Sequence, residues 1–413
     1  MRQAAEAAHQ AVQRLEREYS PMEGYEEFNR QAFRLLFGQS AAAAASDKTV
    51  RFYFAKPFVS FLALTNSFHQ SVTVQTLAGT GAIDLGAAFL GKFFEGRRQV
   101  FISRPSWINY YCIFSNYRFE VATYRYYDAA TKRFDAGGFF DDLAKLPEHS
   151  VVMFQPCGHN PASVQPSVND NHFFHTFLLL ISINYHPFQP DDWQVISAIV
   201  REKKMLPFFD TAYHGLCSPG ADMAADLYPV RLFAEHGHLM LVSQSFSKNM
   251  SLYGERIGSL TVLAATEEQA YRVRSQLRNL IISRYICPPS VTGRTVAAVL
   301  ADDHLREGWL AELAAIGDRL RATRAALRAR LEALLPDRGW AHLTEHSGIF
   351  WYSGLSAATV QRLINEHSVY LCEDGRVNMA GVNGGNLERL AGVIREVLIS
   401  DGGGGGGGGG EDR

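Results

Sequence analysis

The sequence predicts an α/β fold with a large domain built on a mostly parallel sheet and a smaller α+β domain. The chain has 413 residues, more than an ordinary single-core domain needs. From residue 77 onward, short apolar runs alternate with helical segments, which is typical of a parallel sheet covered by helices on both faces. We expect the large domain at 15–315, the small domain at 316–400 and a disordered glycine-rich tail at 401–413.

The expected elements follow this alternation along the chain. The strands are short apolar runs, in order Gln99–Ile102, Glu120–Tyr124, Val151–Gln155, Leu206–Asp210, Met240–Gln244 and Ser259–Ala264. The segment at 71–78 is only a marginal strand. The helices are Ala82–Phe93, Ser106–Tyr117, Phe139–Leu146, Asp192–Lys204, Glu267–Leu280 and one very long region, Val291–Leu335, rich in Ala, Arg and Leu. Pro336 and Gly339 end that region.

The composition excludes several classes of protein. Lys and Arg number 40 and Asp and Glu 42, so the net charge of −2 favours neither a nucleic-acid groove nor an anionic membrane surface. The five cysteines form no C-x-x-C pair, which argues against a zinc ribbon or a disulfide scaffold and fits a reducing compartment. The most apolar run, 173–183, is shorter than the about 20 residues of a spanning helix. We expect a cytoplasmic protein with no metal site.

Two segments rich in small or aromatic residues could bind a phosphorylated, planar ligand. Gly79 and Thr80 open an apolar helix, where backbone N–H groups can approach a phosphate. Trp107, on a loop, could stack on a flat ring, and Asn160, at a strand end, could donate to a ring oxygen. A glycine turn, a core tryptophan and a turn-forming asparagine are the plain structural alternatives. The glycine spacing also faintly resembles a dinucleotide fingerprint, so a dinucleotide oxidoreductase remains an alternative.

Two further segments carry charges that need partners. Asp210 ends a buried strand, where a carboxylate is costly unless it is paired, and Tyr213 follows it. Lys248 lies in a hydroxyl-rich loop just beyond a strand, the position of a desolvated amine nucleophile. Ser245 and Arg256 could anchor a phosphate beside it. The alternative for Asp210 is a helix cap, and the alternative for Lys248 is an ordinary surface lysine. The combination of motifs disfavours the alternative for Lys248.

Taken together in this order, these motifs resemble those of one enzyme family. The matching segments are AGTGA, SRPSW, FEVATYRYYD, FQPCGHNPAS, FFDTAYHG, SFSKNMSLYGERIG, SGIFWYSGL and DGRVNMAG, and the resemblance as a whole covers about residues 15–399. The chain resembles the class I pyridoxal-phosphate aminotransferases, in particular the aspartate aminotransferase branch. The resemblance implies the cofactor pyridoxal 5′-phosphate and a homodimer with its active site at the interface.

The resemblance also implies a role for each matched residue. Lys248 would bind the cofactor covalently and move the substrate proton, and Asp210 would keep the ring nitrogen protonated. Asn160 and Tyr213 would bond the phenolic oxygen of the ring, with Trp107 stacked on it. The phosphate would be held by Gly79, Thr80, Ser245, Arg256 and, across the dimer interface, Tyr19. Arg376 would bind the substrate carboxylate next to Asn160 and Trp107.

The implied reaction is transamination in two half-reactions. An amino acid, of the aspartate or glutamate type by family, gives its amino group to the cofactor, and a 2-oxo acid such as 2-oxoglutarate takes it up. A β-lyase, which needs the same Lys248, and a weakly active or non-catalytic dimeric relative remain alternatives.

Three features depart from the family pattern. The family pattern has an N-terminal segment, contributing to the dimer and the substrate pocket, with no counterpart before Met1. We interpret this as a real truncation or a mispredicted start codon, and a targeting signal could be missing with the segment. Residues 50–70 and 168–189 have no family counterpart. Each starts with Val, whose codons begin with GT, and ends with Gln, which CAG encodes, so both segments are compatible with the boundary bases of an intron. We hypothesise retained introns, with surface loops as the alternative.

Finally, Ile282 replaces the arginine of the family motif R-x-x-Y-S-N-P-P that pairs with a distal substrate carboxylate. Arg284 lies two residues away, so we expect weak aspartate and glutamate activity and a relative preference for apolar or aromatic amino acids.

Overall fold

The computed structural model describes residues 18–38, 70–166 and 191–402. The two hypothesised introns (apart from residue 70) and nearly all of the glycine-rich tail lie outside the described residues.

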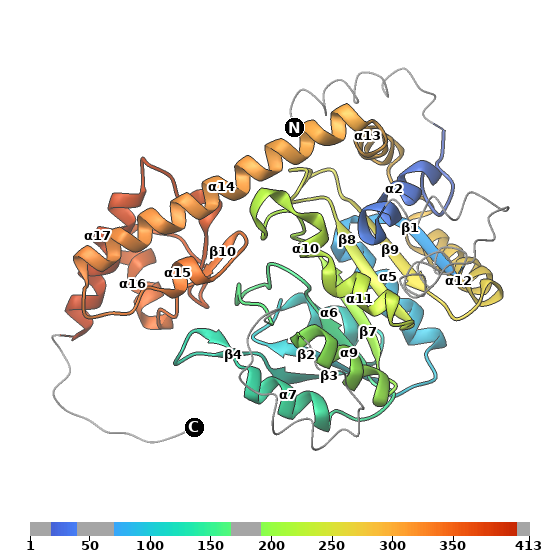
Figure 1. Cartoon of the computed structure of the whole chain (residues 1–413), viewed down its shortest axis with the longest axis horizontal. Helices are drawn as coiled ribbons and strands as arrows, with labels where there is room; N and C mark the ends of the chain where they lie inside the picture. Colours follow the sequence, from blue (N-terminus) through green and yellow to red (C-terminus); the bar gives the residue numbers. More distant parts are fainter. Residues whose placement is uncertain (1–17, 39–69, 167–190, 403–413) are drawn as a thin grey trace, which may run out of the picture.

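A seven-stranded sheet forms the centre of the large unit, in the order β1-β9-β8-β7-β6-β2-β3 (Figure 1). Six strands run in one direction, and only β9 is antiparallel to its neighbours β1 and β8. The strands are β1 Ser71–Leu77, β2 Gln99–Arg104, β3 Glu120–Arg125, β6 Val151–Phe154, β7 Leu206–Thr211, β8 Met240–Ser245 and β9 Ile257–Leu263. The predicted α/β class with a mostly parallel sheet is therefore confirmed.

Helices cover both faces of this sheet, as the alternating pattern predicts. One apolar layer joins the strands to α5 (Ala78–Phe93), α6 (Asn109–Asn116) and α12 (Glu267–Tyr285). The opposite layer joins them to further helices and to a small hairpin. These elements are α7 Ala136–Lys145, α9 Asp192–Glu202, α11 Tyr228–Glu235, β4 Tyr127–Asp128 and β5 Arg133–Phe134.

The region expected to be helical at Val291–Leu335 is helical, and it consists of two helices. Helix α13 (Ser290–Ala301) ends at Asp302, whose backbone is extended at ψ 123°. The Asp302 carboxylate accepts a hydrogen bond from the Leu305 amide at 2.9 Å, which caps α14 (Asp303–Leu334). An aspartate with an extended backbone favours such a helix start over an uninterrupted helix.

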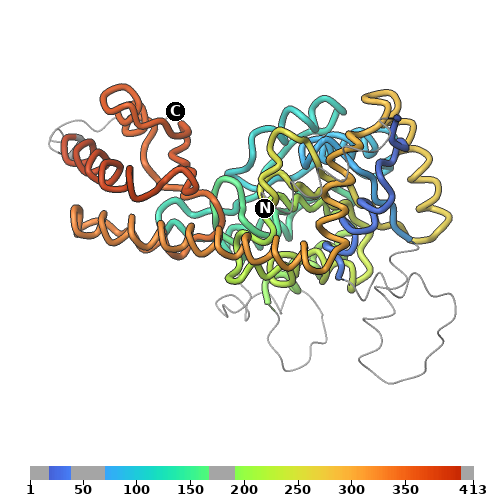
Figure 2. Tube along the Cα trace, turned by 90° about the horizontal axis from the view of Figure 1, so that it is seen from above, coloured from blue at the N-terminus to red at the C-terminus, as the bar shows by residue number. Residues whose placement is uncertain are grey.

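Helix α14 runs from the sheet to a smaller unit formed by the C-terminal elements (Figure 2). These are α15 His342–Glu345, β10 Phe350–Tyr352, α16 Ala357–His367, β11 Arg376–Asn378 and α17 Leu387–Gly402. A third apolar core links this unit to α14, α13, the N-terminal α2 (Glu26–Phe37) and the short segment Pro219–Ala221, which precedes α10 (Met223–Asp226). The expected domain boundary at 315–316 falls inside α14, so the division stays a prediction.

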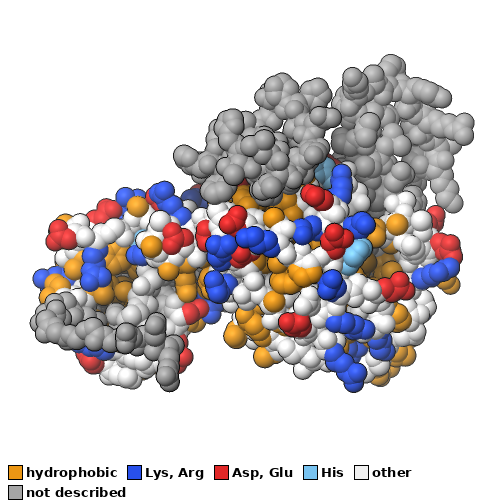
Figure 3. Space-filling model, turned by 90° about the horizontal axis from the view of Figure 1, so that it is seen from below, with side chains coloured by type: hydrophobic (Ala, Val, Ile, Leu, Met, Phe, Trp, Pro, Cys, Tyr) orange, Lys and Arg blue, Asp and Glu red, His pale blue; other side chains and the backbone are white. Residues whose placement is uncertain are grey.

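The surface carries both signs of charge. On the face shown in Figure 3, basic and acidic side chains are interspersed around apolar ones, in line with the small net charge. Among the described residues, no helix is both long and apolar enough to cross a membrane.

Candidate active site

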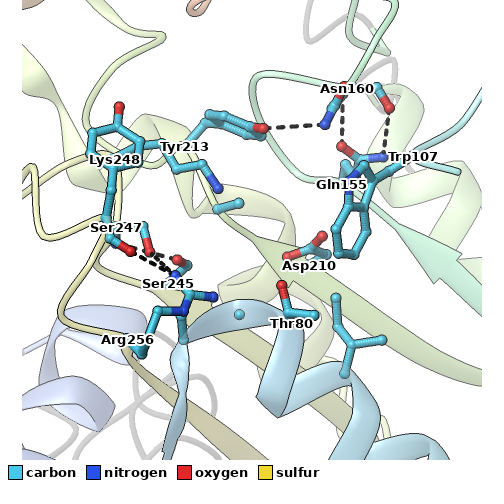
Figure 4. Close-up of a pocket in the computed structure, with 15 residues that line it drawn as sticks. Thr80, Trp107, Gln155, Asn160, Asp210, Tyr213, Ser245, Ser247, Lys248 and Arg256 are labelled. Atoms are coloured by element: carbon cyan, nitrogen blue, oxygen red, sulfur yellow. Dashed lines mark hydrogen bonds between the residues drawn. The ribbon is translucent and has the colours of Figure 1, made fainter. Parts of the chain in front are cut away.

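A cavity of about 120 Å³ opens at the carboxyl ends of the parallel strands. Because parallel strands end at the same edge of a sheet, the segments after β2, β6, β7 and β8 all reach it. The side chains and backbone that line it are Ala78, Gly79, Thr80, Ile83, Trp107, Gln155, Asn160, Asp210, Ala212, Tyr213, Ser245, Ser247, Lys248, Tyr253 and Arg256. Nine predicted site residues thus meet in one place (Figure 4).

Asp210, near the end of β7, is buried, with 7% of its surface exposed. Its Oδ2 accepts a hydrogen bond from the Tyr110 hydroxyl at 2.7 Å. Its Oδ1 is buried and has no hydrogen-bond partner among the described residues. Burial raises the pKa of the Asp210 carboxyl, and the Tyr110 hydrogen bond and the nearby Lys248 charge oppose that rise. A buried carboxylate oxygen without a hydrogen bond is costly, so we expect Oδ1 to accept a hydrogen bond from a cationic donor inside the cavity.

Lys248 follows β8 and reaches into the same cavity. Its Nζ lies 5.1 Å from the centre of the Tyr213 ring. Burial lowers the pKa of the Lys248 amine, Asp210 raises it and Arg256 lowers it further. A half-buried amine with a lowered pKa is more easily deprotonated, as a nucleophile or a base requires.

Asn160 connects the cavity to the small unit. Its Nδ2 donates to the Tyr213 hydroxyl at 3.3 Å, and its Oδ1 accepts from Arg376 Nη1. Arg376 also stacks over the Phe350 ring, with 4.8 Å from Cζ to the ring centre. Its guanidinium thus lies against a residue that lines the cavity, although β11 belongs to the other unit.

The first turn of α5 forms another wall of the cavity. No side chain caps the helix start, so the amides of Ala78, Gly79 and Thr80 remain available to an anion. A Cβ built on Gly79 would lie 3.1 Å from the Ser245 Cβ, which shows how closely the helix approaches β8. Arg256 Nη1 donates to the Ser247 hydroxyl at 3.3 Å. Figure 4 shows Ser245, Ser247 and Arg256 together at this end, away from Trp107 and Asn160.

Two predicted residues lie outside the cavity, and several lining residues were not predicted. Tyr19 is 75% exposed on the surface of this single chain, so its predicted role depends on a second subunit. Arg376 does not line the cavity but contacts Asn160, which does. Of the unpredicted residues, Gln155 holds the Asn160 amide through its Oε1 at 2.7 Å, and Tyr110 holds Asp210. Gln155 lies only five positions before Asn160 on the segment after β6, but its residue type gave no signal. The contact of Tyr110 with Asp210 arises only when α6 packs beside the sheet.

Comparison with known proteins identifies the family. Residues 1–170 and 187–394 match the family described as Aminotransferase class I and II, and the chain belongs to this family. It is 35% identical over 390 residues to the mitochondrial aspartate aminotransferase of Xenopus tropicalis, covering 94% of this chain and 81% of that protein.

Solved structures agree with this assignment. An aromatic-amino-acid aminotransferase of Burkholderia pseudomallei, covalently bound to pyridoxal phosphate, superposes with a TM-score of 0.80 at 34% identity, covering 96% of this chain and 88% of the other. The cytoplasmic aspartate aminotransferase of Saccharomyces cerevisiae superposes with a TM-score of 0.81 at 30% identity, covering 96% and 87%. The predicted aminotransferase fold and enzyme class are confirmed, and the oxidoreductase, lyase and non-catalytic alternatives are not favoured.

The cavity suits pyridoxal 5′-phosphate, the cofactor of this family. The uncapped α5 start and Arg256 provide donors for a phosphate, and the free Asp210 Oδ1 provides an acceptor for a protonated ring nitrogen. Lys248 supplies an amine in the same cavity. The residues present therefore fit the group.

Proposed function

We propose that this chain catalyses transamination between an amino acid and a 2-oxo acid with Lys248 as its catalytic amine. The observation that carries the assignment is the buried Asp210 oxygen without a partner in a cavity that also contains the Lys248 amine. A ring with a positive nitrogen at one end and a group that reacts with amines at the other would satisfy both.

Nine residues of the cavity have a part in this reaction. When bound, pyridoxal 5′-phosphate supplies an electron sink for the pair of electrons left at the substrate Cα. Lys248 binds the cofactor and carries the proton to and from Cα, for which a lowered pKa of its amine is suitable. Asp210 keeps a positive charge on the ring nitrogen. Trp107 covers the ring, Asn160 and Tyr213 orient its phenolic side, and Gly79, Thr80, Ser245 and Arg256 hold the phosphate.

Arg376 binds the α-carboxylate of the substrate in this proposal. Its guanidinium already lies beside Asn160 and stacks on Phe350, so the side chain is oriented before a substrate arrives. A planar guanidinium can bind a carboxylate through two parallel hydrogen bonds, which fixes the substrate geometry as well as its charge.

The relatives and the sequence of this chain suggest different preferences for the substrate side chain. The Xenopus and yeast relatives are aspartate aminotransferases by name, and the Burkholderia relative is an aromatic-amino-acid aminotransferase. We propose that aspartate- and glutamate-type substrates are accepted but weakly, because Ile282 offers no charge. The neighbouring Arg284 is occupied within its own chain: its Nε lies 3.4 Å from Asp84 Oδ2, and its Nη2 donates to the Tyr117 hydroxyl at 2.9 Å.

Assembly and location complete the proposal. We propose a homodimer in which Tyr19 of one subunit reaches the phosphate of the other, which its 75% exposure on the single chain permits. Sedimentation at micromolar concentration tests the dimer. A cytoplasmic location is also proposed, although the Xenopus relative is mitochondrial by name; imaging of the tagged full-length protein tests it.

Reduction of the cofactor-loaded enzyme tests the assignment of Lys248. Borohydride should bleach the cofactor absorbance and leave a pyridoxyl label on the peptide that contains Lys248. Lys248→Ala should lose the label and turnover with a panel of amino acids and 2-oxoglutarate. Full turnover by Lys248→Ala, or a label on another lysine, would refute the assignment.

A further inference from the structure

Helix α6 places a fully buried tyrosine against the carboxylate of Asp210. Tyr110 is 1% exposed, and its hydroxyl donates to Asp210 Oδ2 at 2.7 Å. Its ring packs edge-on against Trp107, with ring centres 5.3 Å apart. Tyr110 is not among the residues that line the cavity, so it acts on the site through Asp210.

The hydrogen bond from Tyr110 makes the two carboxylate oxygens of Asp210 different from each other. Oδ2 is occupied by Tyr110, whereas Oδ1 has no partner among the described residues. A carboxylate held at one oxygen cannot rotate freely, so the direction of the other oxygen is fixed as well. Without the Tyr110 hydroxyl, both oxygens would be buried without a donor, which would favour a protonated and neutral Asp210.

The surroundings of Asp210 contain few other groups that could stabilise its charge. The titratable groups that face it are Tyr110 from α6, Lys248 after β8, Tyr213 after β7 and the Cys157 thiol after β6. Burial raises the pKa of the Tyr110 hydroxyl well above its usual value, so Tyr110 remains a donor at neutral pH. The Lys248 amine is engaged with the cofactor in the loaded enzyme, which leaves Tyr110 as the fixed donor.

We propose that Tyr110 is a positioning residue that keeps Asp210 ionised and directs its Oδ1 towards the ring nitrogen of the cofactor. This inference rests on the proposed function, because it concerns the same cofactor site. It adds a residue that lies one layer behind the cavity and controls where the proton between Asp210 and the ring nitrogen resides.

The test compares Tyr110→Phe with Tyr124→Phe in the cofactor-loaded enzyme. Tyr124 is a matched control: it is also buried, and its hydroxyl donates to the Met153 carbonyl at 2.7 Å, away from the cavity lining. With ¹⁵N-labelled pyridoxal 5′-phosphate, the ring-nitrogen NMR signal of Tyr110→Phe should move towards that of an unprotonated pyridine. The kcat should fall about 10- to 100-fold, as expected for the loss of a hydrogen bond to a charged group. Tyr124→Phe should keep the wild-type signal and kcat.

A second substitution keeps the test decisive if Tyr110→Phe does not fold. Incorporating 3-fluorotyrosine at position 110 retains the shape but makes the hydroxyl a stronger donor, so the ring-nitrogen signal should move in the opposite direction. If the signal and the pH profile of kcat are unchanged in either substituted enzyme, Tyr110 is only a packing residue and the inference fails. Failure of the proposed function is distinct, because then the wild type itself would take no borohydride label on Lys248.

Discussion

Asp210 and Tyr213 lie three residues apart on the same strand end, yet their environments differ. Asp210 has a buried carboxyl group, in which one oxygen accepts from Tyr110 and the other has no partner in the described part of the chain. Tyr213 is neutral, because burial raises the pKa of its hydroxyl, and it accepts one hydrogen bond from Asn160 at 3.3 Å. A buried charge that opposes a cation contributes more than a neutral hydrogen bond.

We therefore expect Asp210→Ala to reduce activity far more than Tyr213→Phe. Removing the partner of a buried cation costs about 3–5 kcal/mol, which lowers kcat/KM by at least about 10²-fold. Losing one neutral hydrogen bond costs about 1 kcal/mol, a change of roughly fivefold. Steady-state kinetics of both variants at saturating cofactor provide the measurement. Equal impairment would show that Asp210 does not support the electron sink.

The lowered pKa of Lys248 predicts a pH dependence of stability in the cofactor-free protein. Burial, then Arg256, lowers the pKa of this amine against the opposing charge of Asp210. Between the lowered pKa and the ordinary value of 10.5, the unfolded chain binds more protons than the folded one, so this group makes the free energy of unfolding rise with pH. At lower pH that contribution is lost.

Urea unfolding of the wild type and Lys248→Met from about pH 8 upward measures this contribution. The stability of the wild type relative to the variant should increase as the pH approaches 10.5. Parallel pH profiles would mean that the Lys248 amine has an ordinary pKa in the folded protein.

At the scale of elements, sequence patterns predicted the strand that carries Asp210 better than the edge strand β1. Strand β7 was expected at Leu206–Asp210 and extends only one residue further, because a continuous apolar run ending in a polar residue is distinctive. Strand β1 appeared marginal, since Thr and Gln interrupt its apolar residues. In the fold, all seven of its residues pair with β9, and the polar Gln75 is buried and donates to the Pro289 carbonyl at 2.7 Å.

Site residues could be predicted from the sequence where one local motif contained both a chemically distinctive residue and the strand end that positions it. The motifs around Lys248 and Asp210 are of this kind, and both residues line the cavity. Tyr110 could not be predicted, because it lies 100 positions from Asp210 in sequence and meets it only when α6 packs beside the sheet. Contacts made by tertiary packing leave no local pattern.

The close approach of α5 to β9 predicts an effect of Gly258→Ala. A Cβ at Gly258 would lie 2.4 Å from the Gln244 carbonyl oxygen and 2.6 Å from the Ala78 carbonyl carbon, so the start of α5 must move. We expect a loss of about 1–3 kcal/mol in the free energy of unfolding, together with weaker cofactor binding, because Gly79 and Thr80 shift with Ala78.

Gly308→Ala is the matched control for this prediction. Gly308 is exposed in α14 and has open space where a Cβ would go, so alanine should raise the stability by about 0.5–1 kcal/mol. Thermal unfolding and cofactor titration of both variants provide the comparison. If Gly258→Ala binds the cofactor as tightly as the wild type, the α5 start does not depend on this contact.

At the scale of the whole molecule, we expect substrate choice to depend on a residue that does not line the cavity of its own chain. Ile282 is 46% exposed on α12 and does not line the cavity of this chain. In the proposed dimer, we expect this position to contribute to the neighbouring active site, as the family motif implies. Arg284 is a poor substitute, because its ion pair with Asp84 and its hydrogen bond to Tyr117 would have to break before it could turn towards a partner.

The last prediction concerns Ile282→Arg. An isoleucine leaves the distal carboxylate of aspartate without a partner, a loss of roughly 3–5 kcal/mol, or at least about 10²-fold in kcat/KM for aspartate. We expect the wild type to use phenylalanine comparatively well, and Ile282→Arg to shift the aspartate-to-phenylalanine ratio of kcat/KM strongly towards aspartate. Ile282→Leu, which keeps the apolar character, serves as the control and should leave the ratio close to that of the wild type. A wild type that already prefers aspartate strongly, or an unchanged ratio in Ile282→Arg, would contradict this assignment of the pocket.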